Sequence, residues 1–251
     1  TAKMDGGWHA LHAASKGNRH QIVDLILNLG VNVNDSVDNG GCAIIIASNH
    51  DSYEVMRRLL KDPDIDLNRQ HPTDGRTALH NAAAAGFYDI LKILLVNGAD
   101  VNITDNGGFS PLCIAAENNN NSKNCVQALL EHGANIEIAG WNGNTCFHLA
   151  ASVGNEDFFD AIINNEALEQ DKVCRNAQRP NMFGFTPYHL AEKHSLAKYI
   201  KDNFGINNID FPPPNSLSCS DFVKQAQKTL PTVSLTAVNL ISKANLLFSN
   251  K

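Results

Sequence analysis

The sequence predicts an all-α solenoid of stacked helix-turn-helix units with hairpin loops, and three observations support this fold class. The segment at residues 75–83 recurs with variations five more times along the chain. Later parts of these units carry apolar residues at helical spacing, as in Ile90, Leu91, Leu94 and Leu95. Short runs rich in asparagine, aspartate and glycine separate the helical segments. Because one two-helix unit cannot bury its apolar side alone, such units must stack.

Two independent sets of anchors fix the period of the repeat. Each recurring segment contains one apolar anchor, and the spacings between anchors are 33, 35, 33, 35 and 41 residues: Leu11, Ile44, Leu79, Leu112, Phe147 and Tyr188. Asparagines that each follow an apolar residue recur every 34 residues: Asn34, Asn68 and Asn102. The long final spacing indicates an insertion of eight residues in the loop at 164–184. Agreement between the two sets indicates a true internal repeat.

Within each unit the elements follow in the order turn, helix, turn, helix, hairpin. First helices begin after a hydroxyl residue that can accept a hydrogen bond from an amide of the first turn: Thr77, Ser110, Thr145 and Thr186. Proline then occupies the first helical position twice, at Pro111 and Pro187. Second helices end at glycines that we expect to be left-handed: Gly30, Gly98 and Gly133. Asparagine-glycine pairs fit the tight turns of the hairpins, for example at residues 106–107.

This pattern resembles the ankyrin repeat, whose period is about 33 residues and whose signature is T-P-L-H-x-A. The resemblance covers residues 5–205 in six copies. We expect a repeat domain over residues 1–206, with units at about 5–34, 38–68, 74–102, 107–137, 142–166 and 183–206. After it we expect a C-terminal helical extension over residues 207–251 that caps the last unit. A separate recognition or connecting element is the alternative for that extension.

The first unit allows two interpretations of the N-terminal end. A stack needs a polar terminal face, and residues 16–20 of the first unit are largely polar, so this unit could cap itself. The alternative, which we favour, is that the chain is the ankyrin part of a larger protein.

A row of histidines shares one position of the repeat: His12, His80, His148 and His189. One interpretation is a metal-binding or catalytic row. We favour the other, a helix histidine that forms a hydrogen bond across the turn, as the resemblance implies. Neighbouring helices lie roughly 10 Å apart, whereas a zinc site needs several ligands within about 2 Å of one ion. Together with the absence of nucleophile or phosphate-loop motifs, this predicts no catalytic residues, no metal site and no cofactor.

Composition limits the kinds of partner that we expect and indicates a cellular compartment. The chain has 20 Lys and Arg against 26 Asp and Glu, a net charge of -6, so a nucleic acid partner is disfavoured. Its sequence contains no apolar stretch near the roughly 20 residues that span a membrane, and we expect neither a membrane nor a small-molecule substrate. The six cysteines show no CxxC spacing, which predicts reduced thiols and a cytoplasmic location.

The ankyrin resemblance implies a non-enzymatic scaffold that binds another protein on a concave face formed by hairpin tips and first helices. We map the partner-binding residues onto that face as Trp8, Arg76, Phe109, Trp141, Asn144 and Phe185. Exposed aromatic residues are favoured binding anchors, so we predict that replacing Phe109 and Trp141 with alanine weakens binding without unfolding the domain. Packing inside the long loop is the alternative for Phe185, and covering an exposed end is the alternative for Trp8.

Two further interpretations concern the protein as a whole. The chain could be the ankyrin targeting domain of a larger enzyme whose catalytic domain lies outside it. Asparagine is frequent, including the run at residues 118–121, which suggests an AT-rich coding genome. By the same resemblance, ankyrin proteins of this composition occur among effectors that intracellular bacteria secrete into host cells, and that origin would place the chain in the host cytosol.

Overall fold

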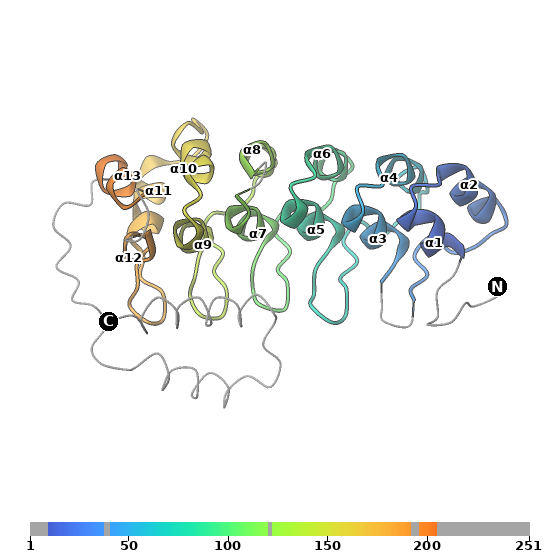
Figure 1. The fold of residues 1–251 in the computed structure, drawn as a ribbon, viewed down its shortest axis with the longest axis horizontal. Coiled ribbons are helices and arrows are strands. Elements are labelled where there is room, and N and C mark those ends of the chain that lie inside the picture. The colour runs from blue at the N-terminus through green and yellow to red at the C-terminus, as the bar shows by residue number, and fades with distance from the viewer. Residues whose placement is uncertain (1–9, 38–40, 120–121, 192–195, 205–251) are drawn as a thin grey trace, which may run out of the picture.

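The computed structural model describes residues 10–37, 41–119, 122–191 and 196–204. Within these ranges the chain forms thirteen helices and two isolated β-bridges, Ser36 with Cys42 and Ala139 with Thr145. Figure 1 shows an elongated stack in which first helices form one layer, second helices form another, and hairpins project beyond the first layer. The predicted all-α solenoid is confirmed.

Six helix pairs make up the stack. The first helices are α1 (Ala10–Lys16), α3 (Ala43–Asn49), α5 (Ala78–Ala85), α7 (Pro111–Glu117), α9 (Cys146–Val153) and α12 (Pro187–Ala191). The second helices are α2 (His20–Asn28), α4 (Tyr53–Leu59), α6 (Tyr88–Val96), α8 (Ser122–Glu131), α10 (Glu156–Ile163) and α13 (Leu196–Asn203). We number the units 1 to 6 in this order. Each unit packs on the next within both layers, so the apolar sides form one continuous core.

The repeat anchors lie in this core as the period predicts. Leu11, Leu112 and Phe147 are fully buried, and Ile44 and Leu79 are 1% exposed. The last anchor, Tyr188, is only half-buried. The predicted left-handed glycines are also confirmed, with φ values of 79° at Gly30, 89° at Gly98 and 82° at Gly133.

The hydroxyl caps are confirmed where a histidine follows three residues later. Thr77 and Thr145 each form a capping box with His80 and His148. Ser110 makes no such cap. Its hydroxyl instead donates to Cys113 Sγ at 3.6 Å, because Cys113 occupies the position that histidine holds in the other units. The prediction that the Ser110 hydroxyl caps α7 is therefore wrong.

The predicted loop insertion contains a helix that the sequence analysis missed. Helix α11 (Gln170–Gln178) packs against α9 and α12, with Val173 and Ala177 fully buried. Lys172 Nζ pairs with Glu137 Oε2 at 2.9 Å, which joins the insertion to unit 4. The insertion is thus an ordered part of the core. The predicted C-terminal extension lies outside the described residues.

Candidate partner-binding site

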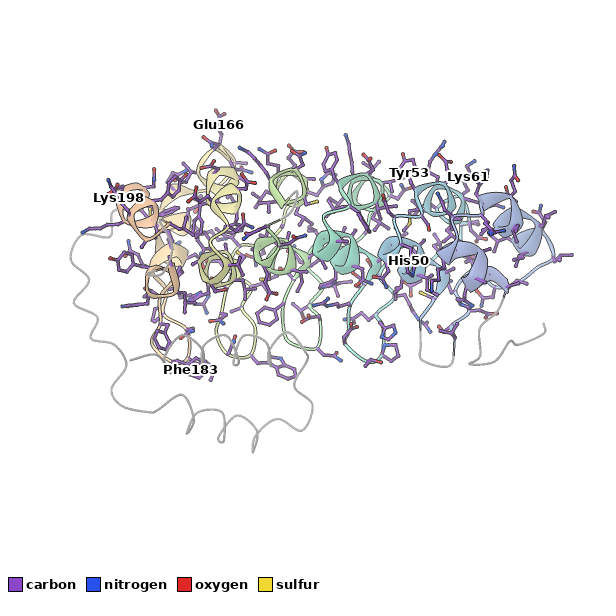
Figure 2. The ribbon with its side chains drawn as sticks, in the orientation of Figure 1. His50, Tyr53, Lys61, Glu166, Phe183 and Lys198 are labelled. Carbon is purple, nitrogen blue, oxygen red and sulfur yellow. The ribbon has the colours of Figure 1, made fainter. Side chains whose placement is uncertain are left out.

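The hairpins of units 3 to 6 are joined at their tips by backbone hydrogen bonds. Asn106 N donates to Asp74 O at 2.8 Å, Trp141 N donates to Gly107 O at 3.1 Å, and Met182 N donates to Asn142 O at 3.0 Å. We call residues 71–76, 104–109, 139–144 and 181–185 the tip rim. Figure 2 shows Phe183 at the hairpin end of the stack, with Tyr53 and Glu166 on the opposite, second-helix side. Each hairpin is therefore fixed relative to its neighbour.

Buried histidines attach the rim hairpins of units 4 and 6 to the preceding first helices. Thr77 N donates to His80 Nδ1 at 3.2 Å, so the ring proton lies on Nε2 and is donated to Phe109 O at 3.0 Å. His148 repeats this arrangement with Thr145 and with Phe185 O, also at 3.0 Å. Burial lowers the pKa of both histidines to about 4, so both rings are neutral near pH 7. The expected hydrogen bonding across the turn is confirmed, and it extends to the next unit.

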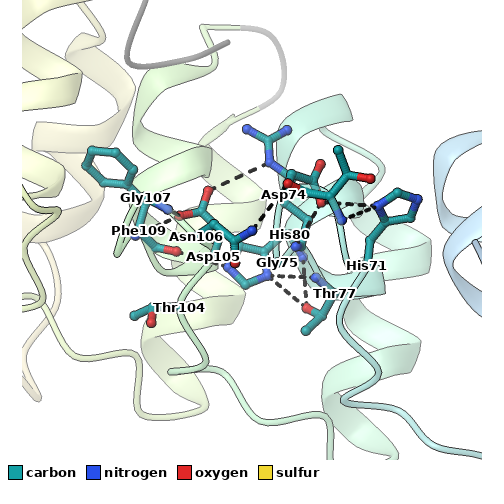
Figure 3. A network of polar contacts seen from close by, with 12 residues as sticks. His71, Asp74, Gly75, Thr77, His80, Thr104, Asp105, Asn106, Gly107 and Phe109 are labelled. Carbon is teal, nitrogen blue, oxygen red and sulfur yellow. Dashed lines mark hydrogen bonds and ion pairs between the residues drawn. The ribbon is translucent and has the colours of Figure 1, made fainter. Parts of the chain in front are cut away.

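An aspartate organises the hairpin of unit 4 (Figure 3). Asp105 is 6% exposed, and its Oδ1 accepts hydrogen bonds from Gly107 N at 2.8 Å and Phe109 N at 3.0 Å. Arg76 Nε lies 3.8 Å from Asp105 Oδ2, and the arginine side chain is 22% exposed. Burial raises the pKa of Asp105, while the two amides and Arg76 oppose that shift. Arg76 thus connects neighbouring hairpins and still reaches the surface.

Two predicted contact residues are not on the surface. Phe109 is 2% exposed and packs against Gly140, where an added Cβ would lie 2.4 Å from two ring atoms. Asn144 is 6% exposed, and its Oδ1 accepts a hydrogen bond from Asn181 Nδ2 at 2.7 Å. The premise that both side chains are exposed is wrong, because the hairpin of the following unit covers each of them.

The exposed apolar residues of the tip rim are Trp141, 53% exposed, and Met182, 72% exposed. Phe185 is half-buried, with its ring edge-on to His189 at 6.4 Å between centroids. Sequence reasoning missed Met182, although it occupies the same hairpin position as Trp141, as the backbone bonds above show. The eight-residue insertion hid this equivalence. Trp8 lies outside the described residues.

In the described ranges, no group of three or more His, Cys, Asp and Glu could hold a metal ion. Nor is any helix of those ranges long and apolar enough to cross a membrane.

Comparison with known proteins identifies the repeat unit independently. A family model for ankyrin repeats (3 copies) matches residues 1–71 and 46–140, and a single ankyrin repeat model matches residues 142–172.

Several curated proteins are similar over part of the chain. The mouse B-cell lymphoma 3 protein homolog is 32% identical over 170 residues, 66% of this chain and 37% of that protein. A putative ankyrin repeat protein of fowlpox virus is 30% identical over 170 residues, 65% of this chain and 49% of that protein. A putative E3 ubiquitin-protein ligase of Arabidopsis thaliana is 32% identical over 150 residues, 57% of this chain and 32% of that protein. The chain thus spans less than half the length of each of these relatives.

Proposed function

Because the chain belongs to the ankyrin-repeat family, whose repeats serve as protein–protein interaction modules, we propose that it binds a protein partner on the face formed by its hairpin tips and first helices. The observation that carries this proposal is the tip rim. Its hairpins are joined by backbone hydrogen bonds and present Trp141 and Met182 to solvent. A surface ordered before binding loses little conformational entropy when a partner docks.

The chemistry of the tip rim suits a partner with an apolar surface patch. Trp141 and Met182 provide apolar area, and tryptophan is enriched among residues that dominate binding energy. Phe185 adds a partly exposed ring, and Arg76, which pairs with Asp105, stays a predicted contact at the edge of the rim. We assign Phe109 and Asn144 to the support of these hairpins rather than to contact. Trp8 stays a prediction.

Affinity capture with paired variants tests this assignment. The purified chain is immobilised, and captured proteins are identified by quantitative mass spectrometry. We expect Trp141→Ala combined with Met182→Ala to reduce capture of the enriched partner at least tenfold. Val96→Ser is the matched control, since Val96 is 69% exposed but lies on α6 in the second-helix layer. Equal capture by the unchanged chain, the double variant and Val96→Ser, with unchanged melting temperatures, would show that the tip rim is not the binding site.

A second candidate function follows from one relative. The Arabidopsis protein is described as a ubiquitin ligase, and the match covers only 32% of it. By analogy, this chain could serve as the targeting domain of a larger enzyme, with the tip rim selecting the substrate protein. Reading the full-length open reading frame distinguishes the two candidates. A catalytic domain in it supports the second.

The chemistry of the cysteines supports a cytoplasmic location. The five cysteines in the described ranges are all free, and four of them are buried. Free thiols persist in a reducing compartment. The net charge of -6 and the scattered basic residues support a protein partner over a nucleic acid.

A further inference from the structure

Helix α2 exposes an apolar stripe at the N-terminal end of the stack. Ile22 is 40% exposed, Leu25 is 66% exposed and Leu29 is 83% exposed. Ile22 and Leu25 lie three residues apart on one side of α2, and Leu29 is the C-cap residue four positions further along. The side of α2 that bears Val23 is buried, and α2 packs on α4. A surface hollow of about 280 Å³ adjoins the stripe and is lined by residues 18–22.

The repeat shows what normally covers the first of these positions. The residues equivalent to Ile22 in units 2 to 5 are fully buried: Val55, Ile90, Cys125 and Phe158. In unit 2 this position contacts the preceding unit directly, since Val55 N donates to Asn18 Oδ1 at 3.2 Å. The preceding helix pair therefore covers this position in the interior of the stack.

Leu25, the second residue of the stripe, also lies where a preceding unit would contact α2. Arg58 in unit 2 is equivalent to Leu25, and its guanidinium reaches back to Asp24 on α2 of the preceding unit. Leu25 is therefore aimed at the place that a preceding second helix would occupy. In units 3 to 5 the equivalent residues are apolar and partly or fully buried in the stack: Ile93, Ala128 and Ala161.

Leu29 extends the stripe in a way that no later unit does. The equivalent residues of units 2 to 5 are polar: Asp62, Asn97, His132 and Asn165. Terminal units of repeat stacks need a polar outer face for solubility. A stripe that adds a leucine at this position indicates an interface and disfavours a terminal cap.

We propose that the outer face of α2 docks one further ankyrin-type helix pair of the same stack, in the register that joins the later units. Continuity with the α2–α4, α4–α6 and α6–α8 contacts favours this occupant over a second copy of the chain. The last second helix, α13, has exposed lysine and aspartate on its surface, which does not match an apolar stripe.

A fusion protein tests the proposal on the full chain. A copy of residues 74–106 replaces residues 1–5, which restores a 33-residue spacing between anchors. We expect the melting temperature to rise by about 5 °C, because the added helix pair covers the apolar stripe of α2. Leu25→Lys should remove that gain in the fusion and change the unfused chain little.

Thiol labelling supplies a second readout in a background without Cys174 and Cys219. Leu25→Cys should react with a maleimide at least tenfold more slowly in the fusion than in the unfused chain. Val96→Cys, exposed on α6, is the control and should react equally in both. Equal labelling of Leu25→Cys in both proteins overturns the proposal. So does concentration-dependent protection in the unfused chain, since a second copy would then be the occupant.

Discussion

His80 and His148 illustrate how one side chain can join a helix to the next unit. Each ring accepts a hydrogen bond at Nδ1 from the cap residue and donates one at Nε2 to a hairpin carbonyl of the following unit. Protonation would place a charge in a buried site and remove the acceptor at Nδ1. The arrangement is therefore stable only while the rings are neutral.

Acid should weaken the stack because of these two residues. Their folded pKa of about 4 lies below the ordinary value of 6.5, so between these limits the unfolded chain binds protons that the folded chain does not. The stability that the two neutral histidines contribute is fully present above pH 6.5 and falls as the pH decreases towards 4. We expect a loss of about 2 kcal/mol per histidine at pH 5 relative to pH 7.5. Asp105, with its raised pKa, acts in the opposite direction.

Urea unfolding at pH 7.5 and pH 5 measures this effect. His80→Gln and His148→Gln should each reduce the difference in unfolding free energy between the two pH values. A pH difference that is unchanged in both variants would show that other groups control acid sensitivity.

Phe109 gives a second prediction about a single side chain. The ring is 2% exposed and fills the space beside Gly140. Replacing it with alanine leaves a cavity, and we expect a loss of about 3 kcal/mol of unfolding free energy. Trp141→Ala is the matched control from the same rim and should cost about 1 kcal/mol or less, because half of that ring is exposed. Chemical denaturation measures the loss of unfolding free energy in both variants. Equal losses would contradict the assignment of Phe109 to the core.

At the scale of elements, periodic signals predicted more than local ones. The apolar anchors, glycine caps and threonine caps all recur, so each copy supported the others, and the helix pairs followed. Helix α11 was missed because it occurs once and lies in a segment that the period treats as extra length. Phe109 and Asn144 were misplaced because the contact that buries each comes from the next hairpin, and a single repeat does not show it. Met182 was missed for a related reason, the shift in register caused by the insertion.

Helix α11 should contribute to stability through its buried side. Val173→Ala removes apolar volume from a fully buried position and should lower the unfolding free energy by about 2 kcal/mol. Lys172→Ala on the same helix breaks the contact with Glu137, a solvent-exposed pair, and should lower the unfolding free energy much less than Val173→Ala. Urea unfolding compares the two. A larger effect of Lys172→Ala would mean that the ion pair, rather than packing, holds the insertion.

For the whole molecule, stability is distributed along the stack. Each unit contacts mainly its neighbours, so the free energy of a repeat protein is close to a sum of unit and interface contributions. Interior units have two such interfaces. The tip rim lies on units 3 to 6, whose hairpins are joined to one another, and units 3 to 5 each pack against a neighbour on both sides. The proposed binding surface therefore lies on the better supported part of the molecule.

Local unfolding should be easier in unit 1, which has one interface, than in the interior units, which have two. In unit 1, helix α2 buries Val23 but exposes Leu25 and Leu29, whereas α6 in unit 3 fully buries Ile90 and Leu91. Opening α2 breaks one interface between second helices, while opening α6 breaks two. Amide hydrogens exchange through such openings at rates set by their free energies. We expect the amides of α2 to exchange at least tenfold faster than those of α6 under native conditions, as measured by mass spectrometry.

In the fusion with an added helix pair, α2 should become as protected as α6. Equal protection of α2 and α6 in the unfused chain would show that the stability of unit 1 does not depend on a covered outer face.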